Sequence, residues 1–66
     1  MSEIILKQEK GSQKEKILFR EDIGEGVFYR VRVNIFDRIG NIVKSEVIPC
    51  FTYINALFTY QDCNIN

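Results

Sequence analysis

The side chains of this 66-residue chain that are able to do chemistry are two cysteines and a small group of carboxylates. The chain has no histidine, which is the usual catalytic base near pH 7. Cys50 precedes a candidate helix, whose dipole would favour the reactive thiolate form of a cysteine. Free cysteine is nevertheless one of the most buried residue types, so we interpret Cys50 as a small core residue.

The carboxylates Glu21, Asp22 and Glu25 lie close together in a segment that is rich in turn formers. A catalytic acid–base pair requires one carboxyl group buried in a pocket. A chain of this length has little room for a pocket of about 300 Å³ or more. We therefore expect these carboxylates to be solvated turn residues, and we expect the protein not to be an enzyme.

The spacing of Cys50 and Cys63 does not fit a metal site. Structural zinc is held by four nitrogen or sulfur ligands at short paired spacings, and the sequence offers no second pair. We therefore expect no metal and no cofactor. The apolar runs are too short for a secretory signal or a membrane span, which favours a cytoplasmic protein with free thiols and no membrane contact.

Charge and size favour a protein partner. Nine basic and nine acidic residues leave no net charge, whereas dedicated nucleic-acid-binding domains carry a basic excess. The hydrophobic content of 45% is typical of a folded domain. A core of this size supplies only about 3–5 kcal/mol, so small domains are often stabilised by a disulfide, a metal or a second subunit. Since we expect neither of the first two, the sequence favours a homodimer.

A β-hairpin is the clearest element of the sequence. Apolar residues alternate strictly along positions 27–36, which is typical of a half-buried strand. A turn follows, in which we expect Gly40 to adopt the left-handed conformation, and a second strand runs from 41 to 49. A three-residue loop would place Asp37 opposite Asn41. The resulting register pairs Val33 with Ser45 on the inner face and Arg32 with Glu46 on the outer face.

The remaining segments are predicted as flanking elements. Residues 17–20 read as a strand, followed by a turn in which Gly24 and Gly26 permit positive φ angles. Residues 1–16 are either a mobile segment or contain a short extra strand at 3–8.

For residues 51–63 the sequence favours a helix that Thr52 caps, although the Phe-Thr-Tyr triplets leave a strand as the alternative. Its apolar side would carry Ile54, Leu57 and Phe58. The predicted fold is one α+β domain over residues 1–66, a small antiparallel β-meander of three or four strands with one C-terminal helix packed on the inner face.

The outer face of the hairpin is the candidate binding site. Its predicted contact residues are Phe28, Arg30, Arg32, Phe36, Lys44 and Ile48. Aromatic residues and arginine are enriched in the energetic centres of protein interfaces. They also form sheet surfaces that stack bases and contact phosphate. The other interpretations are incidental aromatics on an exposed strand, or a face covered by the N-terminal segment.

Residues 27–56 resemble the arm-type DNA-binding domain of tyrosine recombinases and its plant AP2-like relatives. The shared features are a strand reading Tyr-Arg-Val-Arg-Val from Tyr29, a turn containing Gly40, a returning strand, and a helix that opens with Thr52 and has Ala56 four positions later. The resemblance implies a three-stranded sheet that reads the major groove through Arg30, Arg32 and Lys44. This chain departs from the pattern by carrying Glu46 among those positions and by having no net positive charge.

Together these features predict a non-catalytic protein-interaction module. A small self-associating regulator or inhibitor, of the kind that phages and mobile elements encode, fits the size and the absence of catalytic side chains. The alternative is a small nucleic-acid-binding domain that uses the same outer face. The sequence leaves the identity of the partner and the oligomeric state open.

Overall fold

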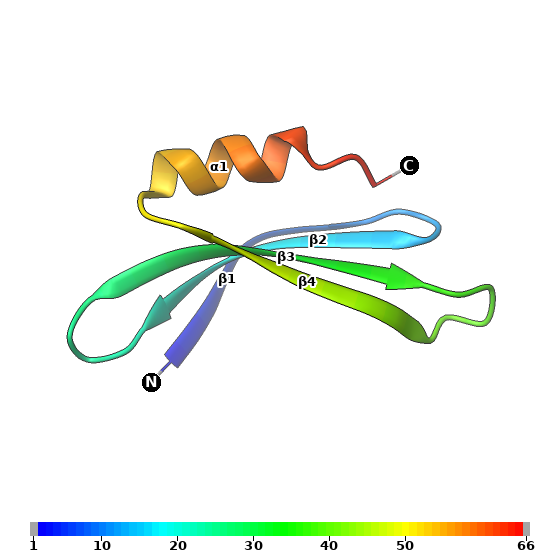
Figure 1. The fold of residues 1–66 in the computed structure, drawn as a ribbon, viewed down its shortest axis with the longest axis horizontal. Helices are drawn as coiled ribbons and strands as arrows, with labels where there is room; N and C mark the ends of the chain where they lie inside the picture. Colours follow the sequence, from blue (N-terminus) through cyan, green and yellow to red (C-terminus); the bar gives the residue numbers. More distant parts are fainter. Residues whose placement is uncertain (1, 66) are drawn as a thin grey trace.

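A computed structural model describes residues 2–65 of the chain. Its elements, in chain order, are β1 (Ser2–Lys10), β2 (Lys14–Asp22), β3 (Val27–Phe36), β4 (Ile42–Cys50) and α1 (Tyr53–Asp62). The strands form one antiparallel sheet in the order β1-β2-β3-β4, and α1 lies across one face of it (Figure 1). The predicted α+β class is confirmed, and the sheet has four strands.

The polar N-terminal stretch is part of the sheet. Residues 2–10, for which the sequence left a mobile segment or a short strand open, form the edge strand β1 and pair with β2. The turn between them closes with a hydrogen bond from the Gly11 N–H to the Lys14 carbonyl (2.7 Å). A Cβ atom at Gly11 would collide with the backbone carbonyl of Ile65, so this glycine allows the C-terminal tail to pass close to the turn.

Two glycines have positive φ angles, as such turns require. Gly24 has φ 87° and Gly40 has φ 93°, whereas Gly26 does not, so the prediction for Gly26 was wrong. In the β3–β4 loop the Asp37 N–H donates to the Asn41 carbonyl (2.9 Å). The predicted three-residue loop between these two residues is therefore confirmed.

The predicted register of the hairpin is wrong beyond its first pair. Phe36 lies opposite Ile42 as the loop dictates, but Ile35 lies opposite Lys44, because a β-bulge adds one residue to β4. Val33 consequently faces Glu46, and Arg32 faces Val47.

The bulge exchanges the two faces of β4 from Lys44 onward. Val47 and Ile48 are both apolar and adjacent, so the local pattern does not determine which of them faces the core. The register that forms places Ile48 and Cys50 beneath the helix, where both pack in or against the core.

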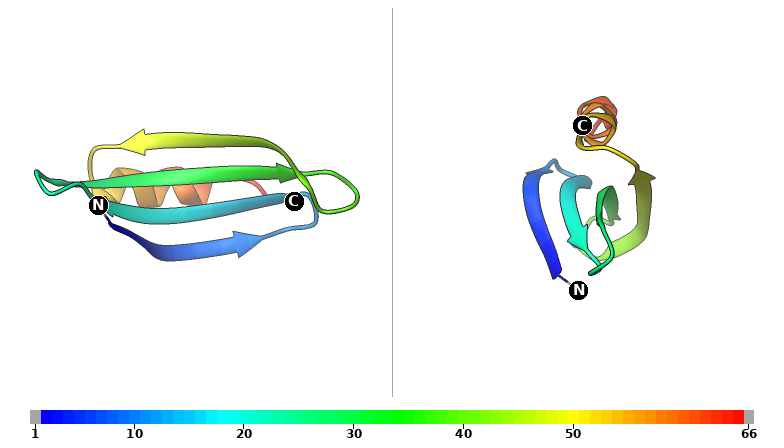
Figure 2. Two further views of the ribbon diagram at one scale, coloured as in Figure 1. Left: turned by 90° about the horizontal axis from the view of Figure 1, so that it is seen from below. Right: turned by 90° about the vertical axis from the view of Figure 1, so that its left-hand side faces the viewer.

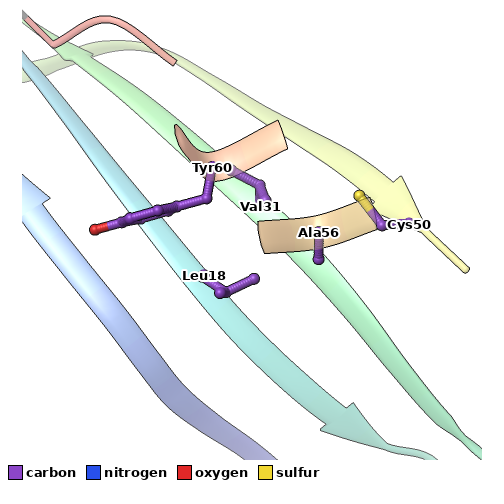
Figure 3. Close-up of a cluster of buried hydrophobic side chains, with 5 residues drawn as sticks. All are labelled: Leu18, Val31, Cys50, Ala56 and Tyr60. Carbon is purple, nitrogen blue, oxygen red and sulfur yellow. The ribbon is translucent and has the colours of Figure 1, made fainter. Parts of the chain in front are cut away.

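The core lies between α1 and the middle of the sheet. Five buried side chains form it (Figure 3): Leu18, Val31, Cys50, Ala56 and Tyr60. The predicted helix is confirmed, and its Thr52 cap accepts a hydrogen bond from the Asn55 N–H (3.1 Å). The predicted apolar side is right only for Leu57, which packs against the core, whereas Ile54 and Phe58 are 62% and 61% exposed. Ala56 and Tyr60 face the sheet instead, since a small and a large residue together fit the space above Leu18 and Val31.

A buried lysine fastens the end of this helix to the sheet. Lys16 lies on β2, and its Nζ donates to the carbonyls of Tyr60 (2.9 Å) and Cys63 (3.2 Å). The same ammonium lies 4.4 Å from the centre of the Tyr60 ring. The last turn of α1 contains no basic residue. The cation that complements the negative end of the helix dipole therefore comes from β2.

We expect Lys16→Met to destabilise the fold by about 1–3 kcal/mol, because two helix-end carbonyls lose their donor while they stay buried or partly buried. Urea unfolding followed by circular dichroism measures this loss. Lys14→Met, on the same strand, is the matched control and should change stability by less than about 0.5 kcal/mol. Equal stability of the two variants would contradict the anchoring role of Lys16.

Tyr60 should make the fold sensitive to alkaline pH. Burial raises the pKa of its hydroxyl above the ordinary value of 10.0, and the negative charge of Glu9 raises this pKa further. The folded state then holds the proton more tightly than the unfolded state does. The contribution to stability is therefore complete below pH 10 and is lost as the pH rises through the folded-state pKa.

Tyr60→Phe should remove this alkaline loss, because phenylalanine has no hydroxyl that could ionise. Unfolding free energies between about pH 9 and pH 11 test this expectation. Tyr53→Phe, which changes a more exposed tyrosine, should keep the alkaline loss. A Tyr60→Phe profile identical to that of the unchanged chain would contradict the expectation.

Candidate functional site

The outer face is the sheet face that points away from α1. Figure 2 shows α1 on one side of the sheet, and no described element covers the other side. β1 extends the edge of the sheet and does not fold over this face. Side chains that alternate along β3 and face away from the core place Phe28, Arg30, Arg32 and Phe36 here. Contrary to the prediction, the shifted register places Lys44 and Ile48 on the helix side, opposite Ile35 and Val31.

The centre of the outer face is closed by Arg32. Phe19 and Ile17 are buried there, although no helix covers them. The Arg32 guanidinium lies 4.9 Å from the centre of the Phe19 ring. The Nη2 atom of Arg32 lies 4.0 Å from the Oε1 atom of Glu3. The arginine that the sequence marked as a contact residue therefore shields an aromatic ring from water.

A line of polar side chains crosses all four strands next to this centre. Gln8 and Asn34 donate to the two carboxylate oxygens of Glu15 (2.9 and 3.1 Å), and the Ser45 hydroxyl donates to Asn34 Oδ1 (2.7 Å). The hydrogen bonds from Asn34 and Gln8 lower the pKa of Glu15. Phe36 lies beyond this line, beneath the Lys10 ammonium (4.7 Å), so it is separated from Phe28 at the other end of β3.

A hollow opens at the Phe28 end of the outer face. Its volume is about 190 Å³ and its lining residues are Phe28, Arg30, Pro49, Cys50 and Phe51. Arg30 is held in place by an ion pair with Glu21 (2.9 Å). Phe51 follows β4 and is 91% exposed. The hollow thus combines apolar walls with one cation, Arg30, whose side chain is held in position and neutralised by the carboxylate of Glu21.

Sequence reasoning missed Pro49 and Phe51 as lining residues of this hollow. The sequence predicts only that Pro49 ends a strand and that Phe51 begins the helical segment. The available signal was a large aromatic residue directly before a helix cap, a position that a single helix–sheet contact does not bury. The sequence also does not predict that Ile54 and Phe58 are exposed. Apolar residues lie on more than one side of this helix, so their spacing does not determine which side faces the sheet.

The exposed apolar surface is large for a chain of this size. Within the described residues, fourteen large hydrophobic side chains are exposed, against seven hydrophobic residues that are buried on either face of the sheet. Isolated exposed hydrophobic residues are normal, whereas a surplus gathered on strand edges and around a hollow is typical of contact surfaces.

Three of the residues that suggested chemistry in the sequence, Cys50, Glu21 and Asp22, have structural partners. Cys50 and Cys63 are free thiols, and the buried Cys50 Sγ lies 3.7 Å from the Thr59 hydroxyl. Glu21 pairs with Arg30, and Asp22 accepts a hydrogen bond from the Gly24 N–H (2.9 Å). Residues 2–65 contain no group of three side chains able to hold a metal ion, and no helix among them is long and apolar enough to span a membrane.

No family model, curated protein or solved structure matches this chain at a significant level.

We expect Arg32→Ala to destabilise the fold by about 1 kcal/mol, because it exposes the Phe19 ring and removes the cation above it. Urea unfolding gives the change directly. Arg38→Ala, in the exposed β3–β4 loop, removes the same charge without uncovering a ring and should be close to neutral. A neutral Arg32→Ala would show that the guanidinium does not shield the core.

Proposed function

We propose that this chain is a non-catalytic, self-associating protein-interaction module that contacts a partner protein through the hollow at the Phe28 end of its outer face. The observation that carries the proposal is the hollow itself, with the exposed Phe51 beside it and Arg30 fixed by Glu21. Aromatic side chains and arginine are the residue types that contribute most of the energy at protein interfaces.

The hollow suits an apolar side chain of the partner. Covering Phe51 removes a large aromatic surface from water, which is worth about 1.5–3 kcal/mol when burial is complete. The site is also preorganised, because Phe28 and Pro49 belong to paired strands and Arg30 is held by its ion pair. Little side-chain freedom is lost when such a site is occupied.

The charges support a protein partner more than nucleic acid. Arg30 and Arg32 both lie beside carboxylates, of Glu21 and Glu3, whose negative charge would weaken the attraction of either arginine for a phosphate. Lys44, the third basic contact implied by the resemblance to DNA-binding domains, lies on the other side of the sheet next to Glu46 (2.9 Å).

The surplus of exposed apolar residues supports self-association. A small chain with seven buried hydrophobic residues has little stability to spare, and pairing two copies would cover part of the exposed apolar surface.

Selection of peptides from a displayed library against the immobilised chain tests the proposed contact. We expect selected peptides to carry an apolar anchor and to bind Phe51→Ser at least about tenfold more weakly, a loss typical of an interface centre. Ile39→Ser is the matched control, since Ile39 is exposed in the β3–β4 loop far from the hollow, and it should bind as the unchanged chain does.

Two results would contradict the proposal. One is a set of peptides whose binding Phe51→Ser leaves unchanged. The other is binding of a fluorescent single-stranded oligonucleotide that weakens steeply between about 50 and 200 mM salt and is abolished by Arg30→Ala with Arg32→Ala, which would establish the nucleic-acid alternative.

A further inference from the structure

β4 is an exposed edge of the sheet. It pairs with β3 on one side, and no described strand pairs with its other side. All residues from Ile42 to Val47 are exposed, including Val43 at 63%. An edge strand with free backbone groups and apolar side chains is a template for pairing with another strand.

The order of residues along β4 is self-complementary. The segment reads Ile42, Val43, Lys44, Ser45, Glu46, Val47, Ile48. About Ser45, isoleucine is mirrored by isoleucine, valine by valine, and the basic Lys44 by the acidic Glu46. If two copies of β4 run antiparallel with Ser45 opposite itself, each Lys44 faces Glu46 of the second copy. Each Val43 then faces Val47 of the second copy. Opposite charges and paired β-branched residues are the favourable cross-strand combinations.

We propose that two copies of this chain pair edge to edge through β4, antiparallel, about a twofold axis at Ser45. This inference rests on the self-association in the proposed function and names the surface that performs it. The pairing joins two four-stranded sheets into one continuous sheet, with both helices on the same side. The same patch serves both copies, so the assembly closes as a dimer.

The bulges distinguish β4 from the other edge strand. The extra residue of the β4 bulge is Val43, near the start of the strand, and from Lys44 to Cys50, a segment that includes the axis at Ser45, the register with β3 is regular. The bulge of β1 lies between Ile5 and Lys7, in the middle of its apolar segment. A bulge at that place twists the strand and interrupts a ladder, which is a common protection of edges. β1 is therefore the protected edge and β4 the open one.

The ion pair on β4 also fits the pairing. Lys44 and Glu46 lie on the helix side of the strand and contact each other within the chain (2.9 Å). In the dimer the two copies bring these four charges together with alternating sign. Val47 lies on the outer face, opposite Arg32, and in the dimer it would meet the bulged Val43 of the second copy. The two hollows then open on one shared face, so a partner with two contact segments could bind both.

Cross-linking tests the position of the axis. In Ser45→Cys the two new thiols lie opposite each other, and opposite residues of an antiparallel pair have Cα atoms about 4.5–5.5 Å apart, within disulfide range. With oxidised glutathione as oxidant we expect a covalent dimer on a non-reducing gel. Ser2→Cys is the control: it places the new thiol on the other edge strand, β1, and retains Cys50 and Cys63 as Ser45→Cys does. We expect this variant to stay largely monomeric on the same gel.

A charge exchange tests the pairing without cysteine chemistry. Lys44→Glu alone, and Glu46→Lys alone, place like charges opposite each other twice and should weaken dimerisation by about tenfold or more. The double variant Lys44→Glu with Glu46→Lys restores complementary pairs and should recover the original dissociation constant. Sedimentation equilibrium of the full chain measures all four proteins.

The outcomes separate the two proposals. A strictly monomeric mass at high micromolar concentration would overturn self-association and this interface together. A dimeric mass without a Ser45→Cys cross-link, or without rescue in the double exchange, would overturn the β4 interface alone. Cross-linking through Ser2→Cys in place of Ser45→Cys would assign the contact to β1 and would also overturn this inference.

Discussion

The position of the helix depends on one buried ammonium group. Lys16 reaches from the sheet to the last carbonyls of α1 and lies over the Tyr60 ring. The helix itself carries no basic residue in its last turn, and its core contact is short. This polar anchor therefore supplements a hydrophobic contact that, at this chain length, is too small to hold the helix firmly by itself.

The sheet is organised around two unlike faces. The helix side closes over Leu18 and Val31, while the outer face has no covering element and buries Phe19 beneath the side chain of Arg32. A polar line from Gln8 to Ser45 crosses the same face. These contacts divide the outer face into separate parts, and the part near Phe28 keeps an open hollow. The proposed contact site is thus the part of the outer face whose side chains do not cover Phe19 and do not belong to the polar line.

One inserted residue decides the composition of both faces. The bulge at the start of β4 moves Lys44 and Ile48 to the helix side and Val47 to the outer side. It also makes Ser45 available to the polar line through Asn34. The six-residue site predicted from the alternation of two strands therefore does not exist as one patch. A smaller cluster at the end of the sheet, which includes Pro49 and Phe51, takes its place.

The amino-acid sequence by itself determined the elements whose signals are local. The alternation of β3, the left-handed Gly40 and the Thr52 cap all follow from neighbouring residues, because strand period, glycine freedom and side-chain capping act within a few positions. Only the tertiary structure decided the register of β4 and the side of α1 that faces the sheet. In β4 either Val47 or Ile48 could face the core, and in α1 either Phe58 or Tyr60 could do so, because the two residues of each pair are similar in local preference. The fit between helix and sheet, and the reach of Lys16, select among them.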